Sequence, residues 1–192
     1  MKYLRLISLF LIFIGCNSPN EELTKSFNNH LTNEQIGLII QINKDYDEFL
    51  FQKFPEANNS VKKAYRLLSE AVAKQAAYDG YMLPTDKLNS IQNELIETGF
   101  YKELYLDSEE EFRINYEGQY LKCLEELGKN DKDFKNYYEA IINAGTRPSA
   151  IIASNAYTHL SNENQMDSMK KLLLTFDFIL SQIEMEANSK KS

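Results

Sequence analysis

The sequence lacks tryptophan and has few of the residues from which catalytic and metal sites are built. Only His30, His159, Cys16 and Cys123 supply an imidazole or a thiol among its 192 residues. Neither histidine has a glutamate three residues before it, so the Glu-x-x-His pairs of di-iron helical bundles are missing. Glycine-rich phosphate loops and the Gly-x-Ser-x-Gly motif are also missing. We predict no metal, no cofactor and no catalytic residue, and we expect a protein that is not an enzyme.

The scarce cysteine and histidine residues have structural interpretations instead. Cys123 is the only cysteine after Cys16, so it has no partner for an intramolecular disulfide, and stability must come from a hydrophobic core. We interpret Cys123 as a small buried hydrophobic residue rather than a nucleophile. His159 is expected in the last turn of a helix, where it can interact with the helix terminus.

Basic residues are outnumbered by acidic ones, which excludes a nucleic-acid partner. Without Lys2 and Arg5, 19 basic residues remain against 28 acidic ones, a net charge of −9. Duplex binding depends on clustered lysine and arginine, and the sequence has no such cluster. The acidic run at 107–111 lacks the glycine and the alternating oxygen ligands of a calcium loop. We interpret it as the solvated start of a helix.

Glycine is also sparse, and no segment shows sustained alternation of polar and apolar residues, so strands are not predicted. Apolar residues instead recur at three- and four-residue intervals. We expect an all-α fold, an irregular antiparallel bundle of six or seven helices, with a helical-repeat solenoid as the second possibility. The helices are expected at 33–54, 60–78, 85–98, 108–127, 131–144, 148–160 and 161–187. The segment 100–106 continues a helix or is a connector on the core.

Two capping boxes and two glycines predict several of these helix ends, and a heptad pattern predicts the buried face of the last helix. Thr32 with Gln35 marks the first start, and Ser108 with Glu111 marks the fourth. Gly128 and Gly145 are expected just after the fourth and fifth helices. The last helix is predicted to present one apolar seam. Its members are Met166, Met169, Leu173, Phe176, Leu180 and Ile183.

The first sixteen residues differ from the rest of the chain. Lys2 and Arg5 precede an apolar run of about ten residues, which is the layout of an export signal. A membrane-spanning helix needs about twenty apolar residues, so an uncleaved anchor is the weaker alternative. An ordinary secretory signal is also weaker, because its cleavage site prefers a small residue where Phe13 stands.

The end of this run, Phe13-Ile14-Gly15-Cys16, resembles the lipobox of bacterial lipoproteins. The resemblance implies that residues 1–15 are a signal peptide removed before Cys16, and that Cys16 carries a thioether-linked diacylglycerol and an acylated amino group. Membrane lipid would then hold the protein in the bacterial cell envelope, at the outer rather than the inner membrane. Residues 16–31 are expected to be the lipidated cysteine and a tether, although Leu23, Phe27 and Leu31 also suit a docked helix. The domain then covers 32–187, followed by a disordered tail at 188–192.

Tyrosine is the one abundant aromatic, with twelve residues. Those we expect at the margin of the core are Tyr101, Tyr105, Tyr116, Tyr120, Tyr137 and Tyr138. Such positions suit either a wet core margin or a recognition surface. The guanidinium of Arg147 could bind a carboxylate or phosphate through two parallel hydrogen bonds, or it could bind the end of a helix within the domain. We expect a non-enzymatic binding or adaptor protein that contacts an envelope protein or peptide. The alternatives are an immunity-type inhibitor of a basic toxin and an enzyme with a dispersed site.

Overall fold

The computed structural model describes residues 27–73, 81–106, 112–129, 131–145, 147 and 168–189. Within these ranges the chain is mainly helical, and extended backbone pairs only in an isolated antiparallel bridge between Tyr105 and Ile114. The predicted all-α class is confirmed. Several predicted features lie outside the described residues. They are the segment at 1–16, the acidic run at 107–111, the helix at 148–160 with His159, and residues 190–192.

The first long helix begins where its capping box predicts. Helix α2 covers Asn33–Lys53, the hydroxyl of Thr32 accepts the backbone N–H of Gln35 at 3.2 Å, and the Gln35 side chain accepts the N–H of Thr32 at 3.0 Å. These two bonds satisfy donors that the first helical turn leaves without a partner. The helix ends before Pro55, which opens a short 3-10 helix, η1 (Pro55–Ala57).

Four further predicted helices are present, within the described ranges, close to their expected positions. They are α3 (Val61–Ala73), α4 (Thr85–Glu97), α7 (Lys132–Ala144) and α9 (Ser168–Ser189). Gly99 and Gly145 follow α4 and α7 with positive φ, the conformation in which a helix commonly ends. The segment after Gly99 forms the short helix α5 (Phe100–Leu104) and then enters the bridge at Tyr105.

The predicted start of the fourth helix is wrong. Helix α6 covers only Gln119–Gly128, and residues 112–118 form extended and turn structure. Gly118 explains the difference, because a Cβ atom there would lie 2.0 Å from the backbone oxygen of Glu103. Glu103 also accepts the N–H of Gln119 through its carboxylate at 2.7 Å, and so caps the true helix start. Contacts with α5 therefore set the start of α6 at Gln119.

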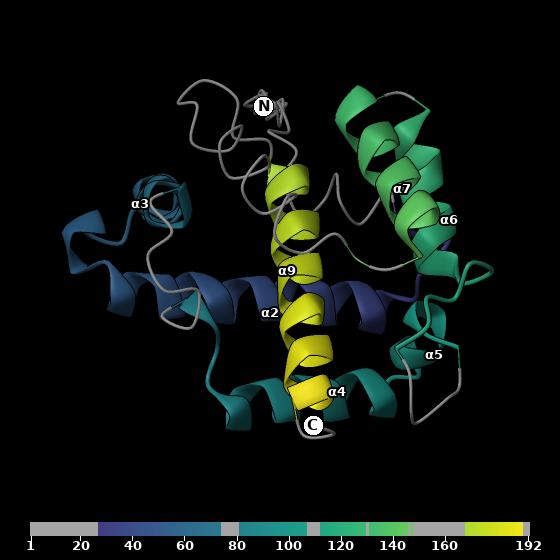
Figure 1. Cartoon of the computed structure of the whole chain (residues 1–192), viewed down its shortest axis with the longest axis horizontal. Helices are drawn as coiled ribbons and strands as arrows, with labels where there is room; N and C mark the ends of the chain where they lie inside the picture. The colour runs from purple at the N-terminus through teal and green to yellow at the C-terminus, as the bar shows by residue number, and fades with distance from the viewer. Residues whose placement is uncertain are drawn as a thin grey trace, which may run out of the picture.

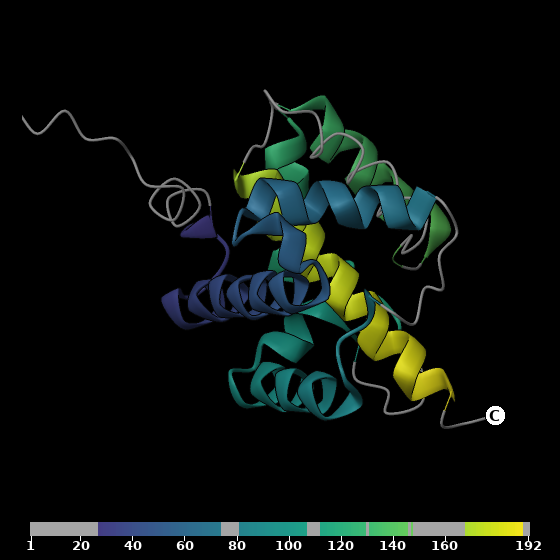
Figure 2. The same ribbon diagram turned by 90° about the vertical axis from the view of Figure 1, so that its left-hand side faces the viewer.

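Helix α9 occupies the centre of the molecule. Figure 1 shows it crossing α2 and α4, with the paired helices α6 and α7 on one side and α3 on the other, and Figure 2 shows the same arrangement from the side. Four residues of the predicted seam, Leu173, Phe176, Leu180 and Ile183, are buried. The remaining faces are buried as well, so between Leu172 and Ile183 every residue except Leu174 is buried. A helix covered on all sides is typical of a core element rather than of a two-helix seam.

The end of the expected tether packs onto the domain. Phe27 is fully buried, Leu31 is 5 % exposed, and the imidazole of His30 pairs with the carboxylate of Glu126 on α6. The His30 contact lowers the pKa of Glu126. Residues 27–31 therefore pack on the domain, with turn structure after Phe27, while residues 16–26, including Leu23 of the predicted docked helix, lie outside the described part of the chain.

Candidate functional site

Arg147 lies at the centre of a buried polar cluster formed by α9 and the helices beside it. Its Nε donates to Asp177 Oδ1 at 2.9 Å, and its Nη1 donates to Glu184 Oε1 at 3.3 Å. The side chains of Arg147 and Asp177 are 3 % and 5 % exposed, and that of Glu184 is 13 % exposed. Arg147 therefore makes a structural link within the chain, through two separate carboxylates of α9 rather than through a helix end.

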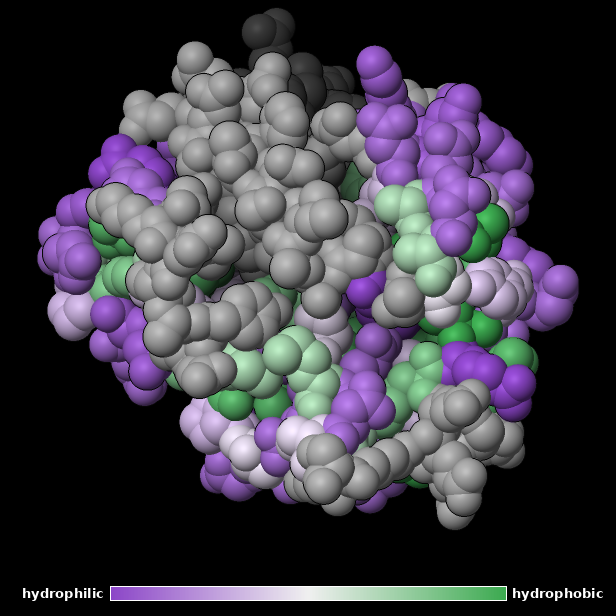
Figure 3. Space-filling view, viewed as in Figure 1, coloured by the Kyte–Doolittle hydropathy of each residue, from purple (hydrophilic) through white to green (hydrophobic). Residues whose placement is uncertain are grey.

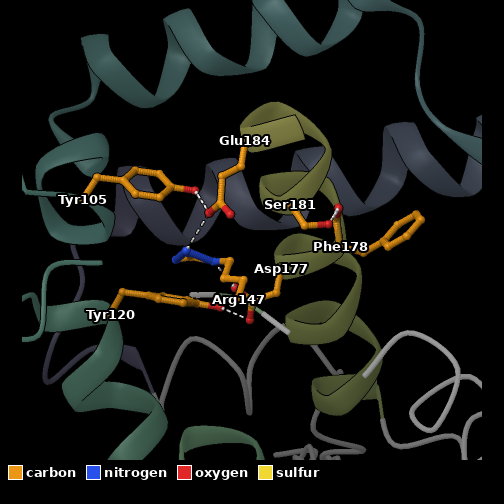
Figure 4. A network of polar contacts seen from close by, with 7 residues as sticks. All are labelled: Tyr105, Tyr120, Arg147, Asp177, Phe178, Ser181 and Glu184. Carbon is orange, nitrogen blue, oxygen red and sulfur yellow. Dashed lines mark hydrogen bonds and ion pairs between the residues drawn. The ribbon is translucent and has the colours of Figure 1, made fainter. Parts of the chain in front are cut away.

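Three of the six singled-out tyrosines complete this cluster, and Figure 4 draws two of them, Tyr105 and Tyr120. Tyr105 donates to Glu184 Oε1 at 2.7 Å, and Tyr120 donates to Asp177 Oδ2 at 3.0 Å. Tyr137 lies close enough to Asp177 for each side chain to shift the pKa of the other. The guanidinium of Arg147 lies over the ring of Tyr105, with 5.0 Å between the guanidinium carbon and the ring centroid. The cluster thus joins charge pairing, hydrogen bonding and a cation–π contact.

The fold explains how residues distant in sequence meet here. Asp177 and Glu184 are seven residues apart, so two turns of α9 place both on one face. The bridge to Ile114 fixes Tyr105, while Tyr120 and Tyr137 come from the neighbouring helices α6 and α7. The cluster therefore links α9 to three separate parts of the domain.

Burial is the largest influence on the ionisation of the acids and tyrosines of the cluster. It raises the pKa of Asp177 and of Glu184, and the charge of Arg147 opposes both shifts. It also raises the pKa of Tyr105, Tyr120 and Tyr137 well above the usual tyrosine value, and the carboxylates add to this effect. These hydroxyls therefore remain hydrogen-bond donors at neutral pH.

Burial tends to lower the pKa of Arg147 itself, but its neighbours outweigh that effect. Tyr105, Asp177 and Glu184 together hold the guanidinium pKa above its usual range, so Arg147 keeps its positive charge. A charged arginine between two acidic side chains forms strong, directional hydrogen bonds to both.

Within the described residues, the other tyrosines of the predicted group form no hydrogen bond with Asp177 or Glu184, although Tyr101 packs against Tyr105. Tyr101 is half-buried, with its ring centroid 5.0 Å from that of Tyr105, and Tyr138 is half-buried on α7. Tyr116 is 45 % exposed, and its hydroxyl would lie 3.4 Å from a Cβ atom placed on Gly145. Ile142, three residues before that glycine, is also exposed. Tyr116 and Ile142 thus present large apolar side chains near the end of α7.

Cys123 is fully buried on α6. Burial raises the pKa of its thiol far above the usual cysteine value, and the charge of Glu126 adds to the shift. The reactive thiolate is therefore disfavoured. This matches the interpretation of Cys123 as a small buried hydrophobic residue.

Sequence reasoning missed Asp177 and Glu184, the two acids that define the cluster. One signal was available, because Asp177 stands between Phe176 and Phe178 in the most apolar stretch of the last helix. A charge in such a position is seldom fully buried without a partner. Its partner Arg147 is thirty residues away and cannot be identified from sequence spacing.

Within the described ranges, no group of three or more histidine, cysteine, aspartate or glutamate residues is placed to hold a metal ion. In the same ranges no helix has the length and hydropathy needed to cross a bilayer. Comparison of the chain with protein-family models, curated proteins and solved structures gave no match. Function is therefore inferred from the residues of this chain and from their geometry.

Proposed function

We propose that this protein is a bacterial envelope lipoprotein, anchored through Cys16, whose helical domain binds another envelope protein or a peptide. The observation that carries the proposal is the N-terminal sequence, in which two basic residues and an apolar run lead to Phe13-Ile14-Gly15-Cys16. Two or three acyl chains would hold the domain far more firmly than a single one, at about 0.8 kcal/mol per buried CH₂.

The Arg147 cluster supports a binding role over a catalytic one. An acid–base mechanism needs a carboxyl group that can reach a substrate. Asp177 is engaged by Arg147 and Tyr120, and the accepting oxygen of Glu184 is engaged by two donors. These contacts tie helices together, which suits a rigid scaffold that presents its outer surface to a partner.

The outer surface offers one place to look for that partner. Figure 3 shows hydrophilic residues over the outer parts of α6 and α7, with hydrophobic residues visible between them. Among the exposed large apolar residues, Tyr116 and Ile142 both lie near Gly145. Apolar and aromatic side chains within a polar rim are typical of protein interfaces.

Lipidation and membrane localisation are tested by intact-mass measurement and membrane fractionation of the protein made in a lipoprotein-processing bacterium. We expect a mature chain beginning at Cys16 with acyl additions, found in the membrane fraction. The Cys16→Ser variant should be neither acylated nor cleaved at that point. Equal, unacylated masses for the two proteins would refute the lipoprotein proposal.

Partner binding is tested separately by photo-crosslinking in cells. A photoreactive residue is placed at Tyr116 or Ile142, and a matched control is placed at Asn93, which is exposed on α4. We expect the first two sites to give the same discrete crosslinked product and the control to give none. If all three sites give the same pattern or no product, the binding surface proposed near Gly145 is wrong.

The acidic charge favours a second candidate, an immunity-type inhibitor that covers a basic toxin. A net charge of −9 after loss of the signal would accelerate association with a cationic partner, and added salt would slow it. If a toxin is encoded beside this chain, deleting the chain should reduce survival when that toxin is present. Unchanged survival would reject this candidate without affecting the lipid anchor.

A further inference from the structure

The five residues that precede Thr32 form a turn packed against the domain. The backbone oxygen of Phe27 accepts the amide of His30 at 2.9 Å and the amide of Leu31 at 2.8 Å. Phe27 is fully buried and Leu31 is 5 % exposed, so both side chains belong to the hydrophobic core. We call residues 27–31 the N-terminal clasp.

One contact between titratable groups joins the clasp to α6. The imidazole Nε2 of His30 meets Oε2 of Glu126, and the two residues are 96 positions apart in the sequence. The side chain of His30 is 17 % exposed and that of Glu126 is 46 % exposed, so the pair lies at the edge of the domain. Burial holds Phe27 and Leu31 in place, whereas the His30–Glu126 pair is the part of the clasp that can respond to the solvent.

The two partners change charge in different pH ranges. Contact with His30 is the largest influence on the pKa of Glu126 and lowers it; burial opposes this shift, and the charges of His30 and Lys129 support it, as does the side chain of Asn29. Glu126 is therefore ionised above about pH 5. A histidine ring loses its positive charge between about pH 5 and pH 8. As the pH rises, the contact changes from an ion pair to a hydrogen bond with one charged partner, and it weakens.

Neighbouring charges leave this pairing intact. Within the described part of the chain, the ring of His30 pairs only with Glu126. On α7, the helix packed against α6, Lys135 and Glu139 pair with each other at 3.9 Å. The remaining charged residues nearest to the pair along the chain, all exposed, are Glu34, Glu125 and Lys129.

We propose that the N-terminal clasp is pH-sensitive, and that the charge on His30 sets how firmly it holds to α6. The clasp is firm while His30 is charged and Glu126 is ionised, and it loosens as the pH rises through the range in which a histidine loses its proton. Because Phe27 and Leu31 stay buried, the pH changes how often the clasp opens and not where it docks. Only one consequence rests on the proposed lipid anchor: each opening would add five residues, at most about 18 Å, to the tether.

Amide hydrogen exchange of the purified protein measures how often the clasp opens, because opening breaks the bonds that protect the His30 and Leu31 amides. Protection is the exchange rate of an unstructured peptide of the same sequence divided by that of the protein, so the effect of pH on chemical exchange cancels. From about pH 5.5 to about pH 7.5 we expect the protection of these two amides to fall by about twofold to fivefold, the range for a surface ion pair. The Phe54 amide, which donates to the Leu50 oxygen at 2.8 Å at the far end of α2, should not follow that fall.

Two glutamine variants on α6 separate the pair from general effects of charge. Glu126→Gln removes the ionised partner of His30 and should abolish the fall in protection. Glu125→Gln makes the same replacement at the neighbouring exposed position and should keep the pH dependence of the wild type. Equal protection at both pH values in the wild type would overturn the proposal, and so would a fall that persists in Glu126→Gln. Neither outcome depends on acylation of Cys16, which the intact mass decides separately.

Discussion

The two sides of α9 are held to the domain in different ways. On the side that faces α2 and α3, most of its polar contacts are isolated hydrogen bonds between uncharged groups. The Asn43 amide donates to the backbone oxygen of Leu172 at 2.8 Å, and the hydroxyls of Tyr65 and Thr175 are 2.8 Å apart. Toward α5, α6 and α7 the contacts converge on Arg147.

Polar groups on the first side are less completely satisfied. Asn43 Oδ1 and Gln182 Nε2 are buried and have no hydrogen-bond partner among the described residues, although Gln182 accepts the N–H of Leu83 at 2.8 Å through its other atom. A neutral contact can be replaced by an apolar one at little cost, whereas one member of a charged cluster cannot be removed alone. The comparison predicts that the two sides respond very differently to mutation.

The largest effect is expected from Arg147→Met. Removing the guanidinium leaves two buried acidic side chains without their cation, and the expected loss is about 3–5 kcal/mol in the free energy of unfolding, measured by urea titration with circular dichroism. Lys171→Met breaks the less deeply buried pair with Asp47, leaves one carboxylate rather than two without its cation, and should cost about 2 kcal/mol. Equal losses in the two variants would contradict the proposed difference between the sides.

Gly118→Ala tests how the charged side is positioned. The added Cβ would overlap the backbone oxygen of Glu103, so the chain on either side of α5 must shift, with an expected loss of about 3 kcal/mol. The control is Gly37→Ala on α2, where nothing lies within 4 Å of a new Cβ. That change should stabilise the protein by about 0.5–1 kcal/mol, because alanine is the better helix former. Thermal unfolding of both variants should show a lower Tm for Gly118→Ala and a higher Tm for Gly37→Ala than for the wild type.

A pair of tyrosine variants compares one hydrogen bond on each side. Tyr120→Phe removes a donor to the charged Asp177 and should cost about 2 kcal/mol, while Tyr65→Phe removes a neutral bond to Thr175 and should cost about 1 kcal/mol. Urea unfolding under identical conditions gives the difference. The comparison fails if Tyr65→Phe costs as much as Tyr120→Phe.

The smallest effect is expected from Asn43→Leu. The backbone oxygens of Ile39 and Leu172 that its amide contacts lie within helices. The substitution also removes the buried Oδ1, which no described residue contacts through a hydrogen bond. We expect a change of less than about 1 kcal/mol in either direction. A loss above about 2 kcal/mol would show that Asn43 is as indispensable as the charged cluster.

Much of the fold could be predicted because local chemistry sets it. The Thr32 capping box, Pro55 and Gly145 mark helix ends through contacts within a few residues. The error in the fourth helix has a long-range cause. Phe112, Tyr116 and Tyr120 are spaced for a helix, but the Tyr105–Ile114 bridge and the close approach at Gly118 hold residues 112–118 in extended and turn structure.

The candidate site could be predicted only in part, for the same reason. Arg147 and the tyrosines are recognisable as unusual residue types, so the sequence drew attention to them. Their acidic partners lie on a helix whose apolar residues at three- and four-residue intervals suggested one seam. Packing across the whole domain decides which other elements cover such a helix. The spacing of apolar residues along the chain does not show which elements these are.

The position of α9 in the chain bears on when the domain can fold. Every other described helix precedes Ser168 and is synthesised first, yet these helices pack around a core that α9 supplies. Until α9 has left the ribosome, the apolar faces of the earlier helices have no central element to cover, so folding is delayed until after most of the chain has been made. Such a chain would reach an export channel unfolded, which is the state that passage across a membrane to the proposed location requires.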